Sequence, residues 1–178
     1  GQLKKIEKDV DLAIKEVLNS SAFINGSKVH EFQDQLENYL DVKHVIPCAN
    51  GTDALQVALM TLDLKQGDEI ICPDFTFVAT AEVIKLLGLK PIFVDVDKDT
   101  FLIDIDKIRA AITPNTRAII PVHLFGQCAN MQAIQEIADE NNLYVIEDTA
   151  QAIGAAFTFK NGNKQKAGAI GTIGTTSF

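Results

Sequence analysis

The sequence contains no tryptophan, and its 178 residues include only three cysteines. Cys48, Cys72 and Cys128 form no CxxC pair, so the paired spacing of zinc sites and redox dithiols is missing. Each cysteine has apolar neighbours, which favours a small buried hydrophobic side chain. The odd number of cysteines, in a chain that shows no secretory leader, indicates a reducing compartment, and the cytoplasm is the expected location.

Positive charge is also scarce, because 16 Lys and Arg stand against 24 Asp and Glu and give a net charge of −8. Such a chain repels a phosphate backbone, so we expect no nucleic-acid partner. No apolar run approaches the roughly 18 residues that a transmembrane helix needs, so no membrane partner is expected either. A phosphorylated small ligand would have to be bound locally, by backbone N–H groups at a helix terminus.

The histidines are too few and too scattered for a metal site. His30, His44 and His123 show no metal-ligand spacing relative to one another or to the cysteines, so no metal is expected. His123 ends an apolar run that is typical of a strand. We interpret it as an orienting or packing residue rather than a catalytic one.

Hydrophobic residues make up 47% of the chain, which is enough for one well-buried core. Apolar residues at three- and four-residue steps predict two helices, over residues 3–17 and 29–40, and Ser27 is the expected N-cap of the second. We therefore assign residues 1–43 to an N-terminal helical segment and residues 44–178 to a single large domain.

From residue 44 onward, short apolar runs alternate with helical patterns, which is the spacing of βαβ units. The runs are apolar at nearly every position, as expected of a parallel sheet with helices on both faces. An Asn-Gly-Asn sequence within residues 160–166 predicts an exposed hairpin loop. The predicted strands cover residues 44–48, 69–72, 91–95, 117–122 and 143–147, and the predicted helices cover residues 52–63, 76–87, 104–112 and 130–141.

Ligands of such sheets bind at the carboxyl ends of the strands. After the first predicted strand, Gly51 and Thr52 open a helix whose free N–H groups and threonine hydroxyl can hold a phosphate. The alternative is an ordinary capped helix with Asp53 in its first turn. The sequence here is neither a P-loop nor GxGxxG, so it gives no support to a nucleoside triphosphate site or a Rossmann dehydrogenase.

Aromatic residues follow the second predicted strand, in Phe75-Thr76-Phe77. Phe77 is the preferred candidate for stacking against a planar heteroaromatic ligand. The alternative is that either ring fills the core.

The strand that ends in Glu147-Asp148 runs directly from apolar residues into two carboxylates. A buried carboxylate needs a cationic partner, and a pyridinium nitrogen would serve Asp148 in that way. Gln151 could donate to a phenolate oxygen. Residues 168–178 resemble a further strand that ends in hydroxyl side chains, and Ser177 there could add a phosphate ligand. The alternative is an Asp-capped turn.

Taken together, these motifs resemble the DegT/DnrJ/EryC1/StrS family of sugar aminotransferases, over the whole chain and in register. Any one of the motifs is common, but their order along one chain is specific. They are Phe23-Ile24-Asn25-Gly26, Asn50-Gly51-Thr52-Asp53-Ala54-Leu55, Pro73-Asp74-Phe75-Thr76-Phe77-Val78-Ala79-Thr80, Pro121-Val122-His123-Leu124-Phe125-Gly126-Gln127, Glu147-Asp148-Thr149-Ala150-Gln151 and Thr176-Ser177-Phe178.

The resemblance implies a fold and a cofactor. The fold is the type I fold of aspartate aminotransferase, a three-layer α/β/α domain with a mixed, mostly parallel seven-stranded sheet. The cofactor is pyridoxal 5′-phosphate. The implied contacts are Thr52 and Ser177 with the phosphate, Gly51 allowing close approach, Phe77 on the ring face, Asp148 with the ring nitrogen and Gln151 with the ring hydroxyl.

The resemblance also implies an activity, which is transfer of an amino group from glutamate to a nucleotide-linked keto sugar. The sequences Cys48–Gln56 and Gly126–Ala129 are most similar to enzymes that act on a UDP-linked 3-keto N-acetylhexosaminuronic acid. Such enzymes serve surface polysaccharide or lipopolysaccharide biosynthesis. A cytoplasmic homodimer with shared active sites is expected.

Family members are about twice as long, and their Schiff-base lysine would fall four residues past Phe178. We therefore expect no catalytic residue within the chain, no small C-terminal domain, and no activity from the chain alone. Two alternatives stay open. Keto-sugar dehydratases on the same scaffold carry a histidine at the lysine position, and the chain could also be an inert cofactor-binding fragment.

Overall fold

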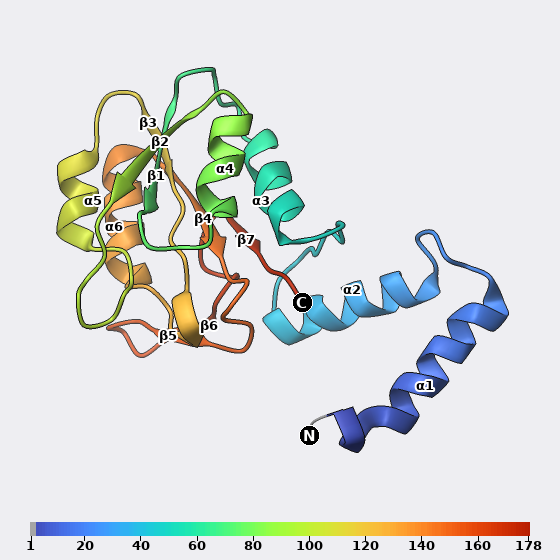
Figure 1. Ribbon diagram of the computed structural model, residues 1–178. Coiled ribbons are helices and arrows are strands. Elements are labelled where there is room, and N and C mark those ends of the chain that lie inside the picture. The colour runs from blue at the N-terminus through green and yellow to red at the C-terminus, as the bar shows by residue number, and fades with distance from the viewer. Residues whose placement is uncertain (1–2) are drawn as a thin grey trace. The chain divides into compact units, whose positions relative to one another are not determined.

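The computed structural model describes residues 3–178 (Figure 1). The chain divides into two compact units, Gly1–Pro47 and Cys48–Phe178. The sequence places the boundary between residues 43 and 44, and that assignment stays a prediction.

The first unit contains two helices, α1 (Leu3–Ser20) and α2 (Ser27–Leu40). Ser27 was predicted to cap α2, and this is wrong because the helix begins at Ser27 and Gly26 is its N-cap. The chain turns so tightly before α2 that a Cβ on residue 26 would collide with the carbonyl oxygen of Ala22. Glycine therefore occupies the cap position, and the helix has no side-chain cap.

Residues 44–48 were predicted to form a strand, and this is also wrong. Within residues 3–178 no strand pairs with this segment. The Val45 N–H donates instead to the Glu37 side chain at 2.9 Å, and Ile46 is 75% exposed. An apolar run becomes a strand only where a neighbouring backbone completes its hydrogen bonds.

The second unit is built on a five-stranded sheet in the order β2-β1-β3-β4-β7, with every neighbouring pair parallel. Helices lie in the connections from β1 to β2, from β2 to β3 and from β3 to β4, as is usual for parallel pairing, whereas the connection from β4 to β7 contains the strands β5 and β6 and no helix. The strands are β1 (Glu69–Pro73), β2 (Lys90–Val94), β3 (Thr116–Ile119), β4 (Tyr144–Asp148) and β7 (Ile173–Thr175), and the helices are α3 (Gly51–Met60), α4 (Ala79–Leu86), α5 (Ile105–Ala111), the short 3₁₀ helix η1 (Leu124–Gly126) and α6 (Met131–Asn141).

Helices cover both faces of this sheet, with α3 and α4 on one side and α5 and α6 on the other (Figure 1). Successive strand residues point to opposite faces. Ile70 accordingly packs with Leu59 and Ile84, whereas Ile71 packs with Ile108 and Ile134. The predicted three-layer α/β/α class is confirmed.

The resemblance implies a mixed sheet of seven strands, and the sheet that the described residues form differs from it. Strands β5 (Ala156–Thr158) and β6 (Lys164–Lys166) make a separate antiparallel pair, so the main sheet has five strands and is entirely parallel. The turn between β5 and β6 is the predicted exposed hairpin loop. None of the helices in the described part of the chain has the length and apolar character needed to cross a bilayer.

Candidate functional site

A pocket opens at the edge of the sheet where the parallel strands end. Its cavity volume is about 210 Å³, and all of its walls come from the second unit. The segments that follow β1, β4 and β7 meet the N-terminus of α3 there, as expected for a ligand site in a parallel α/β sheet. The pocket is lined by Asn50, Gly51, Thr52, Leu55, Thr76, Phe77, Ala79, Val122, Asp148, Ala150, Gln151, Thr175, Thr176 and Ser177.

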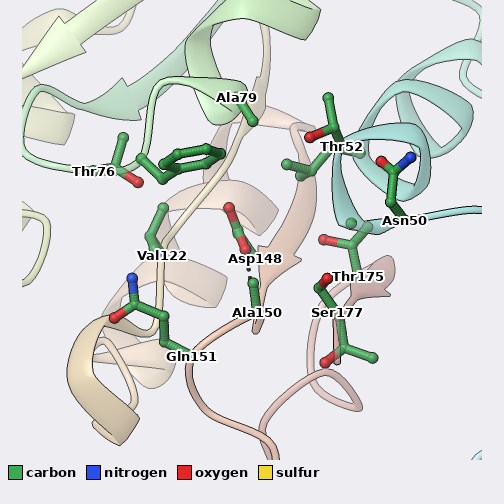
Figure 2. Close-up of a pocket in the computed structure, with 14 residues that line it drawn as sticks. Asn50, Thr52, Thr76, Ala79, Val122, Asp148, Ala150, Gln151, Thr175 and Ser177 are labelled. Atoms are coloured by element: carbon green, nitrogen blue, oxygen red, sulfur yellow. Dashed lines mark hydrogen bonds between the residues drawn. The ribbon is translucent and has the colours of Figure 1, made fainter.

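Asp148 lies in the middle of this pocket (Figure 2). It is the last residue of β4 and only 6% exposed. Its Oδ2 accepts a hydrogen bond from the Thr80 hydroxyl at 2.9 Å, and its Oδ1 accepts one from the Ala150 N–H at 3.2 Å. A carboxylate has about four acceptor positions, so lone pairs remain for a ligand. The centre of the pocket is therefore a fixed acceptor suited to a cationic N–H group.

The N-terminus of α3 forms one side of the pocket. The Asn50 side chain caps the helix by accepting the Asp53 N–H at 2.9 Å. The N–H groups of Gly51 and Thr52 belong to the first turn, where a helix offers no internal acceptor, and the helix dipole adds partial positive charge. This end of α3 is suited to an anionic group such as a phosphate.

Ser177 lies against this helix terminus. A Cβ added to Gly51 would come within 2.8 Å of the Ser177 Cβ and 3.3 Å of its Oγ. Glycine at position 51 thus allows the Ser177 hydroxyl to approach the free N–H groups. Figure 2 shows Thr52 and Ser177 on the same side of Asp148.

The two aromatic residues after β1 occupy different environments. Phe75 packs against Phe101, with ring centroids 5.5 Å apart. Phe77 lines the pocket and is 69% exposed. The alternative in which Phe77 fills the core is therefore wrong, and its ring is available to a ligand.

Gln151 lies on the other side of Asp148 from Thr52 and Ser177 (Figure 2). Its Oε1 accepts the N–H of Phe125 at 3.0 Å. This contact orients the amide, because the oxygen is used by the protein and the NH₂ group is left as a donor. Ala150 contributes only a methyl group to the pocket wall and leaves space above Asp148.

Glu147 points to the opposite face of β4 from Asp148 and is fully buried. It accepts hydrogen bonds from the backbone N–H groups of Gly168, Ile170 and Gly171 at 3.0, 2.7 and 2.6 Å. Its fourth donor is His123 Nε2 at 2.9 Å. Burial raises the pKa of Glu147, but the hydrogen bonds from His123 and the backbone outweigh it, so this pKa lies below its ordinary value.

His123 is fully buried in the same network and does not line the pocket. Its Nδ1 accepts the N–H of Ala129 at 3.1 Å, so the ring hydrogen is on Nε2 and is donated to Glu147. The orienting and packing interpretation agrees with this position.

The six site residues predicted from the sequence all line one pocket, although their roles toward a ligand stay predictions. They are Gly51, Thr52, Phe77, Asp148, Gln151 and Ser177. Sequence reasoning gave no role to Thr80, which bonds Asp148, or to Glu147. The signal for Glu147 was its place next to Asp148, since neighbouring strand residues face opposite ways.

A sequence model of the DegT/DnrJ/EryC1/StrS aminotransferase family matches residues 4–178. The whole chain is 45% identical to a UDP-2-acetamido-2-deoxy-3-oxo-D-glucuronate aminotransferase of Pseudomonas aeruginosa and covers 48% of that protein. A GDP-perosamine synthase of Caulobacter vibrioides is 44% identical over 86% of the chain, which covers 40% of that protein. The chain thus spans about half the length of the curated relatives it matches.

Three solved structures also superpose on this chain. A DegT/DnrJ/EryC1/StrS aminotransferase from Brucella abortus superposes with a TM-score of 0.93 at 43% identity, over 99% of this chain and 48% of that one. A Bacillus subtilis protein with bound cofactor PMP (pyridoxamine 5′-phosphate) superposes with a TM-score of 0.81 at 42% identity, over 84% of this chain and 34% of that one. A GDP-4-keto-6-deoxymannose-3-dehydratase superposes with a TM-score of 0.84 at 32% identity, over 92% of this chain and 43% of that one.

Proposed function

Because this chain belongs to the DegT/DnrJ/EryC1/StrS aminotransferase family, we propose that it forms the cofactor-binding part of an enzyme that transfers the amino group of glutamate to a nucleotide-linked keto sugar. The observation that carries the proposal is the pocket itself. It sets a buried carboxylate, a helix N-terminus with a serine hydroxyl, and an exposed phenylalanine ring around one cavity.

Pyridoxal phosphate is the cofactor of this family, and the residues present fit it. It supplies an electron sink that stabilises negative charge next to the reacting carbon. In the proposed arrangement, Thr52, Ser177 and the free N–H groups of α3 hold the phosphate, and Phe77 lies against the ring face. Asp148 accepts the ring N–H, and the Gln151 amide donates to the ring hydroxyl.

Asp148 and the helix terminus lie at different places in the pocket, which suits the two ends of this ligand (Figure 2). A negative carboxylate stabilises a protonated ring nitrogen. The N-terminus of α3 stabilises the phosphate at the other end. The chain's own residues therefore bind and orient the ring, and they complement its charges with opposite charges.

The finer substrate proposal is a UDP-linked 3-keto N-acetylhexosaminuronic acid. It is supported by the sequences Cys48–Gln56 and Gly126–Ala129 and by the 45% identity with the Pseudomonas aeruginosa aminotransferase. The product would serve surface polysaccharide or lipopolysaccharide biosynthesis. The homodimer with shared sites and the cytoplasmic location stay predictions, and sedimentation analysis of the purified protein tests the first.

A second candidate function is dehydration of a keto sugar. The dehydratase that superposes with a TM-score of 0.84 favours it, because the same scaffold carries that reaction in that protein. The residue four positions past Phe178, where the resemblance implies a lysine, distinguishes the two candidates.

The test uses the complete protein that carries this sequence, with pyridoxal phosphate, ¹⁵N-labelled glutamate and the UDP-linked 3-keto sugar. We expect ¹⁵N in the sugar product and loss of this activity in the Asp148→Ala variant. A product that has lost water without gaining nitrogen would favour the dehydratase. No turnover of any nucleotide-linked keto sugar would contradict both candidates.

A further inference from the structure

A fully buried hydroxyl lies behind the central carboxylate of the pocket. Thr80 is in the first turn of α4, is 0% exposed, and donates its hydroxyl hydrogen to Asp148 Oδ2 at 2.9 Å. The two residues are 68 positions apart in the sequence, so the bond joins α4 to the end of β4.

A second threonine continues this contact. The hydroxyl oxygens of Thr76 and Thr80 are 3.2 Å apart. A hydroxyl has one hydrogen, and that of Thr80 is used by Asp148, so Thr76 is the donor in this pair. The hydrogens therefore run in one direction, from Thr76 to Thr80 to Asp148, and each bond polarises the next.

These contacts fix the plane of the carboxylate. Rotation about the last torsion of an aspartate is broad, so its oxygens are not oriented by the backbone alone. Here one oxygen is held by Thr80 and the other by the Ala150 N–H at 3.2 Å. With both oxygens fixed from the protein side, the remaining lone pairs have a defined direction.

We infer that Thr80, supported by Thr76, is a positioning residue that turns the Asp148 carboxylate toward the ring nitrogen of the bound cofactor. The inference rests on the proposed function. A different role would be purely structural, in which Thr80 only fastens α4 to β4. The two roles differ in what they require of the ligand, because only positioning depends on a ring N–H group.

The experiment compares two probes by titration calorimetry. One is pyridoxamine 5′-phosphate, and the other is its 1-deaza analogue, in which a C–H group replaces the ring nitrogen. Thr80→Val keeps the side-chain volume and removes the hydroxyl, Thr80→Ser keeps the hydroxyl, and Thr116→Val is the matched control. Thr116 is a buried threonine at the opposite end of the sheet, and its hydroxyl accepts the Thr113 N–H at 2.9 Å.

We expect Thr80→Val to weaken binding of pyridoxamine 5′-phosphate about tenfold, since hydrogen bonds to charged groups have that effect. Binding of the deaza analogue should change by less than about twofold, because it makes no N–H contact with Asp148. Thr80→Ser should restore the wild-type preference, and Thr116→Val should leave both affinities unchanged.

Equal weakening of both probes by Thr80→Val, or no weakening of either, would overturn the positioning role while leaving the proposed function in place. If Thr80→Val does not fold, as circular dichroism would show, Thr76→Val replaces it, with the same selective loss expected at a smaller size. A wild-type protein that binds neither probe would overturn the proposed function and this inference together.

Discussion

Two adjacent carboxylates in β4 have different roles because they face opposite sides of the sheet. Asp148 keeps lone pairs free for a ligand, whereas all four contacts of Glu147 are made within the protein. The sequence could predict that one of the two carboxylates faces a ligand. It could not predict the partners of Glu147, because Gly168 and His123 come next to it only through the fold.

Glu147→Gln should destabilise the protein by about 2–4 kcal/mol at pH 7, because the amide places a donor against backbone N–H groups that the carboxylate accepts. The pKa of Glu147 is lowered from its ordinary value of 4.5, so its contribution is fully present above pH 4.5 and is lost as the pH falls through the folded-state pKa. Urea unfolding at pH 7 and in steps below pH 4.5 checks this.

The control for that series is Glu136→Gln, at an exposed position of α6, which should change the unfolding free energy by less than about 0.5 kcal/mol. The charge-based explanation would be contradicted if the difference in unfolding free energy between wild type and Glu147→Gln stayed constant as the pH was lowered below 4.5.

Phe77→Leu should lower the affinity for pyridoxamine 5′-phosphate by about two- to tenfold, since stacking contributes about 0.5–1.5 kcal/mol beyond burial. Stability should be almost unchanged, because the side chain is 69% exposed. Phe75→Leu is the matched control. It should lower the stability and leave the affinity almost unchanged, because Phe75 packs against Phe101 outside the pocket lining. Calorimetry measures the affinity of both variants, and thermal unfolding measures their stability. The assignment would be refuted if Phe77→Leu lowered the stability and left the affinity unchanged.

At the scale of helices and strands, the hydrophobic periodicity predicts the ends of most helices and strands of the second unit to within about three residues. It does so because apolar runs and stripes follow burial directly. Residues 44–48 were misassigned because a strand also requires a partner, which no local pattern encodes. The cap of α2 was misassigned because the close approach of the backbone at Gly26 is a property of the turn before it.

The N-terminus of α3 gives a prediction at this scale. Gly51→Ala should destabilise the protein by about 1–3 kcal/mol, because the new methyl group would lie 2.8 Å from the Ser177 Cβ. Ser177→Gly removes that Cβ, so the cost of Gly51→Ala should largely vanish in the double variant. A double-mutant cycle from urea unfolding measures the coupling, and strictly additive changes would show that the two residues do not compete for the same space.

At the scale of the whole molecule, residues spread from 51 to 177 converge because the carboxyl ends of parallel strands share one edge. From that rule the sequence predicts that six residues lie around one pocket, and all six line it. It could not supply the Thr80–Asp148 bond or the orientation of Gln151 by Phe125, because both depend on the exact packing of α4 and η1 against the strand ends.

The proposed amino transfer would require an amine that reaches the pocket. None of the residues that line the pocket in the described chain is a lysine, and Lys160 and Lys164 are exposed in the β5–β6 hairpin. An exposed lysine keeps its ammonium hydrated and is a poor nucleophile, whereas a catalytic lysine is desolvated. The 178-residue chain should therefore bind pyridoxamine 5′-phosphate reversibly yet transfer no amino group from glutamate.

Borohydride reduction with pyridoxal phosphate, followed by peptide mass spectrometry, checks this directly. We expect only scattered, substoichiometric labelling of surface lysines, with no change when Lys160 or Lys164 is replaced by arginine. Stoichiometric labelling of a single lysine within residues 1–178, competed by pyridoxamine 5′-phosphate, would mean that an amine of this chain reaches the pocket. The pocket described here would then be complete for covalent chemistry, and the expectation of a lysine beyond Phe178 would be wrong.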